Sequence, residues 1–258
     1  MHNALITGGA RRLGRAMALT LAARGCNVAI HYHGSEAEAE DTARACRAHG
    51  VRAVTLQADL LDEAQVVPLL PAATKALGAP IDLLVNNASV FEYDNIHTAT
   101  RTSWDRHMES NLRAPYVLTQ AFAEQAPKAD RSAGEPRAQA MVINMIDQRV
   151  RKLTPEFSTY TLAKMGLWAL TRTAAMGLAP DIRVNAIGPG PTLQGGRQTL
   201  EHFTKQRQST ILERGSDPED ICAALTYLMD AKSVTGQLIC TDGGQHLGWQ
   251  TPDILGTE

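Results

Sequence analysis

The sequence lacks the features that mark membrane-spanning, fibrous and nucleic-acid-binding proteins. Its 258 residues carry 25 Lys and Arg against 27 Asp and Glu, and this near balance predicts no basic surface for nucleic acid or an anionic membrane. No apolar run approaches the roughly 20 residues of a membrane-spanning helix, and no signal-peptide pattern or internal repeat is present. We therefore expect a soluble cytoplasmic protein that binds neither nucleic acid nor membranes.

Cysteine is also scarce, and the histidines are dispersed. The four cysteines show neither close pairing nor metal-ligand spacing, so reduced structural thiols are expected at Cys26, Cys46, Cys222 and Cys240. The eight histidines are scattered, apart from His31 and His33 at the end of a strand-like segment. A metal site is therefore not expected.

What the sequence does contain is a regular alternation of strand-like and helix-like segments. Apolar strands are predicted at 3–7, 27–31, 52–57, 81–86, 140–145, 182–187 and 237–241. Helices are predicted at about 12–24, 35–49, 63–77, 101–125, 154–178, 198–212 and 218–230. Continuously apolar strands separated by helices are typical of a parallel sheet covered on both faces. The predicted fold is α/β, a single Rossmann-type doubly wound domain over residues 1–258, with about seven strands and helices on both faces.

Ligands of such sheets bind at the carboxyl ends of the strands, near the point where the strand order reverses. The segments that begin at Thr7, His31, Asp59, Asn86, Asp147 and Pro189 all fall at such ends. Residues 127–139 are polar and are interpreted as a surface loop rather than a domain linker. Residues 188–197 form a second irregular segment, which carries Pro and Gly and precedes a polar helix.

The first of these ends has the pattern of a phosphate-binding turn. The strand that ends in Thr7 enters Gly8-Gly9-Ala10-Arg11-Arg12-Leu13-Gly14, and an amphipathic helix follows. Glycines let the backbone approach a phosphate closely, and a helix N-terminus favours an anion. The spacing is not G-x-G-x-x-G, and a strand-to-helix turn without a ligand is the alternative reading.

Tyr160, Lys164 and Asp147 are the candidate catalytic residues. Positions i and i+4 of a helix share a face, so the Lys164 ammonium can approach the Tyr160 phenol. A nearby cation favours the phenolate and lowers the pKa of tyrosine, which suits proton exchange near neutral pH. A chance spacing of one Tyr and one Lys remains the alternative unless other motifs accompany it.

Such motifs are present, and together they resemble the short-chain dehydrogenase/reductase family over nearly the whole chain. The resemblance rests on Thr7-Gly8…Gly14, Asp59-Leu60, Asn86-Asn87-Ala88, Asn111, Tyr160-x-x-x-Lys164, Pro189-Gly190 and Asp242-Gly243-Gly244. Within the family the chain is most similar to the pteridine reductases, which include bacterial dihydromonapterin reductases. The features that point there are Arg12, the run His31-Tyr32-His33-Gly34-Ser35, the run Asn87-Ala88-Ser89-Val90-Phe91, and Asp147 where most family members have serine.

The resemblance implies a nicotinamide cofactor. The absence of an acidic residue at the end of the second strand favours NADPH over NADH. NAD-preferring folds usually place an acid at the end of strand two, whereas here the first acid is Glu36, already in a helix. Arg11 and Ser35 are candidate partners of a 2′-phosphate. Ser35 also fits a helix cap, because Glu38 follows three residues later. The expected cofactor-binding residues are Thr7, Gly8, Arg11, Arg12, Leu13, Gly14, His31, Tyr32, His33, Ser35, Asp59, Leu60, Asn87, Ala88, Ser89, Tyr160, Lys164, Pro189 and Gly190.

Asp147 distinguishes this chain from relatives that act on alcohols and ketones. An ionised aspartate cannot donate a hydrogen bond to a substrate oxygen, and its charge raises the pKa of a neighbouring tyrosine. A coupled Asp147–Tyr160 pair suits a proton relay to the nitrogen of a C=N bond. A polar cap at the end of a strand is the alternative role for Asp147.

The same reading assigns roles to the other candidate residues. By resemblance, Lys164 tunes Tyr160 and anchors ribose, Asn111 holds ordered water, and the segment at about 188–212 covers the substrate. Phe91 is expected to stack on a flat heteroaromatic ring, although packing under a loop is the alternative. The expected substrate-binding residues are Arg12, Ser89, Phe91, Asp147 and Tyr160.

The helix predicted at 154–178 also bears on assembly, because it is apolar on most sides. One stripe comprises Ala163, Gly166, Leu167, Leu170 and Ala174, and the other Leu162, Met165, Trp168, Ala169 and Met176. One stripe can face the sheet while the other needs a partner, most simply the same helix of a second copy. We expect a homotetramer, as is common in the family, although a monomer that buries both stripes is the alternative.

The sequence therefore predicts an NADPH-dependent reductase of pterin-like C=N bonds. Its substrate would be a small dihydropterin, dihydromonapterin included, or dihydrofolate. Two alternatives stay open. One is a reductase of sugar, steroid or 3-oxoacyl ketones in the same family, and the other is a non-catalytic NADPH-binding regulatory protein.

Overall fold

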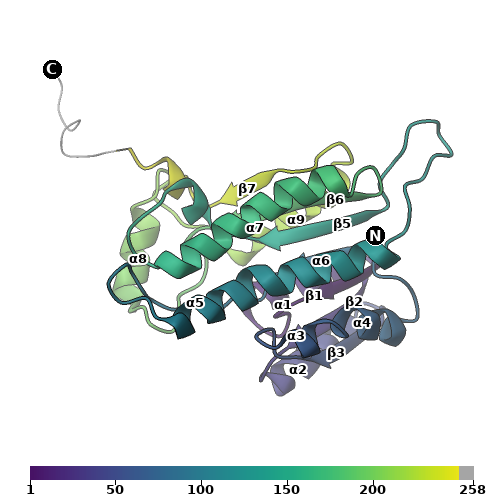
Figure 1. Cartoon of the computed structure of the whole chain (residues 1–258), viewed down its shortest axis with the longest axis horizontal. Coiled ribbons are helices and arrows are strands. Elements are labelled where there is room, and N and C mark those ends of the chain that lie inside the picture. The colour runs from purple at the N-terminus through teal and green to yellow at the C-terminus, as the bar shows by residue number, and fades with distance from the viewer. Residues whose placement is uncertain (250–258) are drawn as a thin grey trace.

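A single sheet organises the computed structural model, which describes residues 1–249. Its seven parallel strands run in the order β3-β2-β1-β4-β5-β6-β7 (Figure 1). They are β1 Asn3–Ile6, β2 Asn27–Tyr32, β3 Ala53–Gln57, β4 Leu83–Asn86, β5 Ala140–Met145, β6 Ile182–Pro189 and β7 Leu238–Thr241. The predicted doubly wound parallel sheet is confirmed. Residues 250–258 of the predicted domain lie outside the described part of the chain.

Helices cover both faces of the sheet (Figure 1). They are α1 Arg12–Ala23, α2 Glu36–Arg47, α3 Glu63–Val66, α4 Leu69–Leu77, α5 Arg101–Met108, α6 Ala114–Gln125, α7 Ser158–Gly177, α8 Leu200–Gln208 and α9 Pro218–Asp230. Helices α1, α2 and α9 bury apolar side chains against one face, and α4, α6 and α7 against the other. Successive strand residues alternate between these two cores, as the pleat requires, so that Ile6 joins the first and Leu5 the second.

Four predicted helices differ from the structure in their bounds. The helix predicted at 63–77 is divided into α3 and α4 around Pro68, because proline has no N–H to continue the helical hydrogen bonds. The helix predicted at 101–125 contains a π-helical segment, Glu109–Arg113, between α5 and α6. The helix predicted at 198–212 is shorter, and α8 spans Leu200–Gln208.

The fourth difference affects the helix that carries Tyr160 and Lys164. The predicted start at 154 is wrong, since α7 begins at Ser158. Pro155 lies in the preceding segment, and Phe157 has a left-handed backbone with φ of 57°. A non-glycine residue adopts that conformation only where surrounding contacts hold it there. The segment between Asp147 and α7 is therefore a structured loop with its own place in the site.

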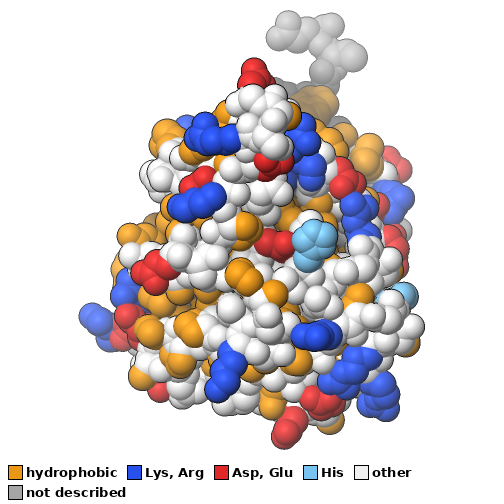
Figure 2. Space-filling view, turned by 90° about the vertical axis from the view of Figure 1, so that its right-hand side faces the viewer, with side chains coloured by type: hydrophobic (Ala, Val, Ile, Leu, Met, Phe, Trp, Pro, Cys, Tyr) orange, Lys and Arg blue, Asp and Glu red, His pale blue; other side chains and the backbone are white. Residues whose placement is uncertain are grey.

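The surface carries no dominant charge on the side that Figure 2 shows. Lys and Arg side chains are interspersed there with Asp and Glu, and neither sign forms a continuous patch. Among residues 1–249, no helix combines the length and apolar character that crossing a bilayer requires.

Candidate active site

A cleft of about 1730 Å³ opens at the carboxyl ends of the strands. It lies where the chain reverses direction across the sheet, between β1 and β4, as expected for a doubly wound fold. Every predicted site residue except Thr7 and Asn111 lines this cleft. The structure thus brings together predicted residues that are up to 182 positions apart in the sequence, from Gly8 to Gly190.

The glycine-rich turn packs too tightly to accept side chains at its two key positions. Gly8 has a left-handed backbone with φ of 61°. A Cβ on Gly14 would collide with the Gly8 carbonyl oxygen and lie 2.8 Å from the Asn87 amide nitrogen. Helix α1 begins at Arg12, so its free N–H groups face the cleft. The turn has the geometry that a bound pyrophosphate needs.

Thr7 and Asn87 hold this turn against the loop after β4. The Thr7 hydroxyl oxygen accepts hydrogen bonds from the Asn87 N–H at 2.9 Å and the Ala88 N–H at 3.0 Å. The Asn87 side-chain amide donates to the Thr7 and Gly8 carbonyls at 2.8 and 3.1 Å. Thr7 is buried and therefore supports the cleft from beneath rather than lining it.

His31 lies beneath the same turn and uses both ring nitrogens. Nδ1 accepts from the Gly8 N–H at 3.1 Å, so Nε2 carries the proton and donates to the Ala58 carbonyl at 3.1 Å. Burial lowers the pKa of His31 from its ordinary value of 6.5 to about 4, against the opposing effect of the Ala58 carbonyl. A neutral His31 is therefore part of the folded phosphate turn.

We predict that the buried, neutral His31 makes the free energy of unfolding decrease in acid. Between pH 6.5 and 4 the unfolded chain binds a proton at this position that the folded chain does not, so stability falls as pH falls through that range. The full contribution is about 3 kcal/mol. Urea unfolding from pH 7 to 4 should show a shallower decline in His31→Gln than in wild type. An unchanged decline would contradict this assignment.

The candidate site for a 2′-phosphate is formed by Arg11, from the turn before α1, with His33 and Ser35, which follow β2. Arg11 pairs with Glu38 at 3.4 Å, and both side chains are about half exposed. Ser35 occupies the N-cap position of α2 as predicted, but the capping box does not form, because its side chain makes no hydrogen bond to the helix and Glu38 turns to Arg11 instead. His33 lies 3.8 Å from Asp59 at the next strand end.

Asp147, Tyr160 and Lys164 meet at the opposite end of the cleft. The Tyr160 hydroxyl donates to Asp147 Oδ2 at 3.1 Å, and the Arg149 N–H donates to Asp147 Oδ1 at 2.8 Å. The Lys164 ammonium is buried, donates to the Met145 carbonyl at 2.9 Å and lies 5.6 Å from the Tyr160 ring centroid. Two of its three N–H donors remain for a ligand.

The electrostatics of this group differ from the expectation that Lys164 lowers the pKa of Tyr160. Burial and the neighbouring Asp147 carboxylate raise the pKa of Tyr160 well above 10. Burial also raises the pKa of Asp147, against the opposing effects of the Arg149 N–H and charge. Burial lowers the pKa of Lys164 to about 8. Asp147 and Tyr160 therefore hold their protons more tightly than free side chains do, as a proton donor should.

An aromatic wall of Phe91 and Phe157 stands beside this group, and the sequence analysis did not identify Phe157 as part of it. Phe91 stacks on Phe157 with centroids 4.5 Å apart and meets the Tyr160 ring edge-on at 4.7 Å. Arg149 lies over the Phe157 ring at 5.0 Å, and Arg197 lies over Phe91 at 5.4 Å. Phe91 is 46% exposed toward the cleft, so it retains area for a ligand ring.

Asn111 supports the loop that carries Phe91 rather than facing the cleft. It is fully buried in the π-helical segment. Its amide accepts from the Val90 N–H at 2.9 Å and donates to the Val90 carbonyl at 2.8 Å. The predicted role of Asn111 in holding water stays a prediction.

The irregular segment after β6 closes one side of the cleft. Arg12, from the phosphate turn, donates to the Leu193 and Gln194 carbonyls at 3.1 and 2.9 Å. The backbone of Arg12 is left-handed, with φ of 53°. Gly190 packs directly on Asp242, where a Cβ would lie 2.6 Å from the aspartate Cα. The segment is thus anchored at its base and tied at its tip to the phosphate turn.

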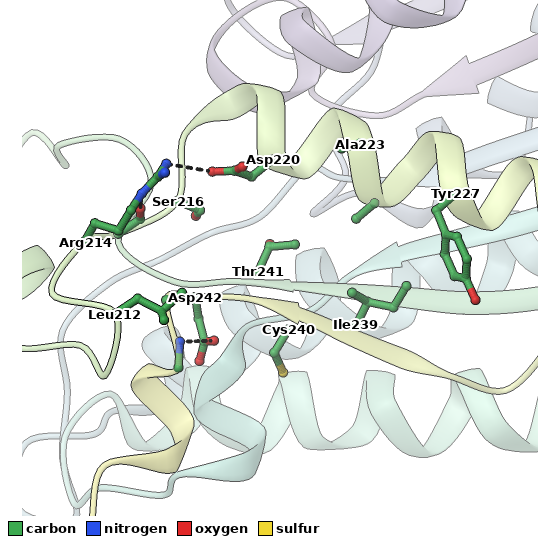
Figure 3. A pocket seen from close by; sticks show the side chains of 14 residues that line it. Leu212, Arg214, Ser216, Asp220, Ala223, Tyr227, Ile239, Cys240, Thr241 and Asp242 are labelled. Atoms are coloured by element: carbon green, nitrogen blue, oxygen red, sulfur yellow. Dashed lines mark hydrogen bonds and ion pairs between the residues drawn. The ribbon is translucent and has the colours of Figure 1, made fainter.

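A second hollow, of about 650 Å³, lies between α9 and β7 (Figure 3). Arg214 and Asp220 pair with each other across its rim at 3.3 Å, as the dashed line in Figure 3 marks. It lacks the combination of phosphate turn, acid–base pair and aromatic wall that the larger cleft has. Residues 1–249 contain no cluster of side chains suited to a metal ion.

Comparisons with known proteins agree with this geometry. The family model described as enoyl-(acyl carrier protein) reductase matches residues 8–246. The 3-oxoacyl-[acyl-carrier-protein] reductase of Staphylococcus epidermidis is 30% identical over 95% of this chain and 99% of its own length. Pteridine reductase 1 of Leishmania tarentolae is 31% identical over 95% of this chain and 96% of its own.

A solved structure is more similar. It is that of the FolM alternative dihydrofolate reductase 1 from Brucella suis in complex with NADP. That chain is 43% identical to this one, with a TM-score of 0.90 and 98% of each chain covered.

Proposed function

We propose that this chain, which belongs to the short-chain dehydrogenase/reductase family, is an NADPH-dependent reductase of pterin-like C=N bonds. The observation that carries the proposal is the hydrogen bond from Tyr160 to Asp147 beside an exposed, stacked Phe91. An acid–base pair next to an aromatic surface suits a flat heterocycle whose nitrogen must be protonated. The substrate is a dihydropterin or dihydrofolate.

The cleft fits the cofactor that this reaction requires. The turn from Gly8 to Gly14 would hold the pyrophosphate, and Lys164 would hold the nicotinamide ribose through its two remaining donors. Bound NADPH supplies the hydride. The Brucella relative, which was crystallised with NADP, supports this assignment.

The chain's own residues then deliver the proton. Phe91 orients the substrate ring, and the phenol of Tyr160 donates its proton to the ring nitrogen. Asp147 shares that proton through its 3.1 Å bond to Tyr160, and the Arg149 N–H holds the carboxylate in position. The segment 188–212, tied down by Arg12, excludes water from the reacting atoms.

The direct test is NADPH oxidation by the purified wild type with dihydrobiopterin, dihydromonapterin, dihydrofolate and a panel of sugar, steroid and 3-oxoacyl ketones. We expect turnover with at least one dihydropterin or dihydrofolate and little with ketones. The similarity to the staphylococcal 3-oxoacyl reductase keeps a ketone reductase as the second candidate. Activity on ketones alone would establish that candidate and overturn the proposal.

The 2′-phosphate assignment predicts a selective effect of Arg11. Arg11→Ala should weaken NADPH binding by about 1.5–3 kcal/mol, while NADH binding changes little, because only NADPH carries the phosphate. Glu38→Gln is the matched control. It frees Arg11 and removes a nearby negative charge, so it should tighten NADPH binding. Fluorescence titration measures both constants, and equal losses for the two cofactors in Arg11→Ala would refute the contact.

The proton relay predicts a change in pH dependence when Asp147 can no longer titrate. Wild-type dihydropterin reduction should decline as pH rises through the raised pKa of Asp147, because Asp147 then no longer carries the proton that it passes on through Tyr160, whose own pKa lies well above 10. Asp147→Asn keeps the shape, and it should lower kcat by about 10²–10⁴-fold and remove that decline. NADPH affinity should stay near wild type. Steady-state rates of wild type and Asp147→Asn from pH 5 to 8 test this prediction. If the two pH profiles match, Asp147 only caps the end of the strand.

We also propose the homotetramer expected from the sequence. On α7, Ala163 and Leu167 of one predicted stripe are buried, whereas Leu162, Met165 and Met176 of the other are 48%, 37% and 74% exposed. This exposed apolar surface supports a second copy as its partner. A monomeric mass in solution would contradict the assembly.

A further inference from the structure

Helices α5 and α7 pack against each other (Figure 1), and a buried polar network next to Tyr160 joins them to the loop after β4. Its members are Asp94, His107 and Thr159, and each is at most 2% exposed. None of the three lines the cleft, so none can touch cofactor or substrate. Buried polar side chains are costly unless they are paired, so a network of this kind needs a reason.

The contacts form one continuous chain of hydrogen bonds. Asp94 Oδ2 and the Thr159 hydroxyl are 2.5 Å apart, and Asp94 Oδ1 accepts from the Thr159 N–H at 3.1 Å. The Thr159 hydroxyl oxygen is 2.6 Å from His107 Nδ1. His107 Nε2 accepts from the Glu92 N–H at 3.1 Å.

Only one arrangement of protons satisfies all these contacts. The Thr159 bonds hold the pKa of Asp94 below its ordinary value in spite of burial, so this carboxylate only accepts. The single hydroxyl proton of Thr159 therefore goes to Asp94, and His107 Nδ1 must donate to Thr159. Since Nε2 accepts from Glu92, His107 is neutral, in agreement with the lowering of its pKa by burial.

Each end of this series of hydrogen bonds holds one side of the candidate active site. Helix α7 has no side-chain cap of its own, because Phe157 occupies the capping position. Asp94 supplies a carboxylate there from a distant loop, bonded to Thr159 immediately before Tyr160. At the other end, Glu92 follows Phe91 directly.

We propose that Asp94, Thr159 and His107 are positioning residues that set the separation between the proton donor Tyr160 and the aromatic platform Phe91. His107 lies between the two. Its Nδ1 binds Thr159 on the Tyr160 side, its Nε2 binds the Glu92 N–H on the Phe91 side, and its ring meets Tyr160 edge-on at 5.9 Å. The inference rests on the proposed function, since it assigns Tyr160 to proton transfer and Phe91 to substrate stacking.

Two substitutions at His107 separate the two ends. The amide nitrogen of His107→Asn lies near the position of Nδ1, so this variant keeps the bond to Thr159 and loses the bond from Glu92. Its KM for the dihydropterin should rise about tenfold while kcat stays near wild type, because the Phe91 loop loosens. The amide oxygen of His107→Gln lies near Nε2, so it keeps the bond from Glu92 and loses the one to Thr159. Its kcat should fall about tenfold with KM little changed.

Thr159 supplies a matched control pair. Thr159→Ser keeps the hydroxyl and should retain the wild-type kcat, whereas the isosteric Thr159→Val should lower kcat about tenfold. NADPH affinity and thermal midpoint are measured for every variant. NADPH affinity should be unchanged in all four, because the network does not reach the cofactor cleft.

The outcomes distinguish this inference from the proposed function. If both His107 variants change the same parameter, or if Thr159→Val matches Thr159→Ser, the positioning role is overturned. If wild type reduces ketones and no dihydropterin, the proposed function fails. The same comparison of kcat with KM on the accepted ketone then decides the positioning role.

Discussion

The site depends on the parallel pairing of β1 with β4. Ala4 faces Leu83 and Ile6 faces Val85 in this register, so both strands end at the same edge. The Thr7 N–H continues the pairing to the Val85 carbonyl at 3.0 Å, and the Thr7 hydroxyl then binds the loop beyond β4. A slip of one residue would turn Thr7 away from that loop and separate the phosphate turn from the substrate-facing loop.

The same edge tolerates buried ionisable groups because each has a partner. Lys164 has no carboxylate within salt-bridge distance among residues 1–249, and burial lowers its pKa to about 8. It remains in place because the Met145 carbonyl accepts from it and the Tyr160 ring lies within 5.6 Å. Asp147 is held by one N–H and one O–H donor.

The sequence predicted the parts of this molecule that are governed by local patterns. The strands were recognisable because each is mainly apolar, and the phosphate turn because Gly8 follows a strand and Gly14 opens an amphipathic helix. Tyr160, Lys164 and Asp147 were found through spacing together with family motifs, and the structure brings them together.

The unpredicted features of the site depend on contacts between distant segments. Glu38 fits a capping box in sequence, yet it pairs with Arg11, which is 27 residues away. Phe157 is part of the site only because a left-handed backbone turns it onto Phe91, 66 positions earlier. Its spacing of three residues before Tyr160 was the one available hint. Asp94 caps α7 from 65 residues away, a relation that no local pattern encodes.

Overall sequence identity to relatives does not reveal the substrate of this fold, because only a few residues contact the substrate. The relatives include reductases named for 3-oxoacyl groups and for pteridines at nearly the same overall identity, 30% and 31%. A serine at position 147 could donate to a carbonyl oxygen, whereas the Asp147 carboxylate accepts from Tyr160 and from the Arg149 N–H. This difference in hydrogen-bond direction is why we propose transfer of a proton to nitrogen rather than binding of a ketone oxygen. Under that proposal, the substrate preference of the cleft depends on the direction of one hydrogen bond beside a conventional dinucleotide site.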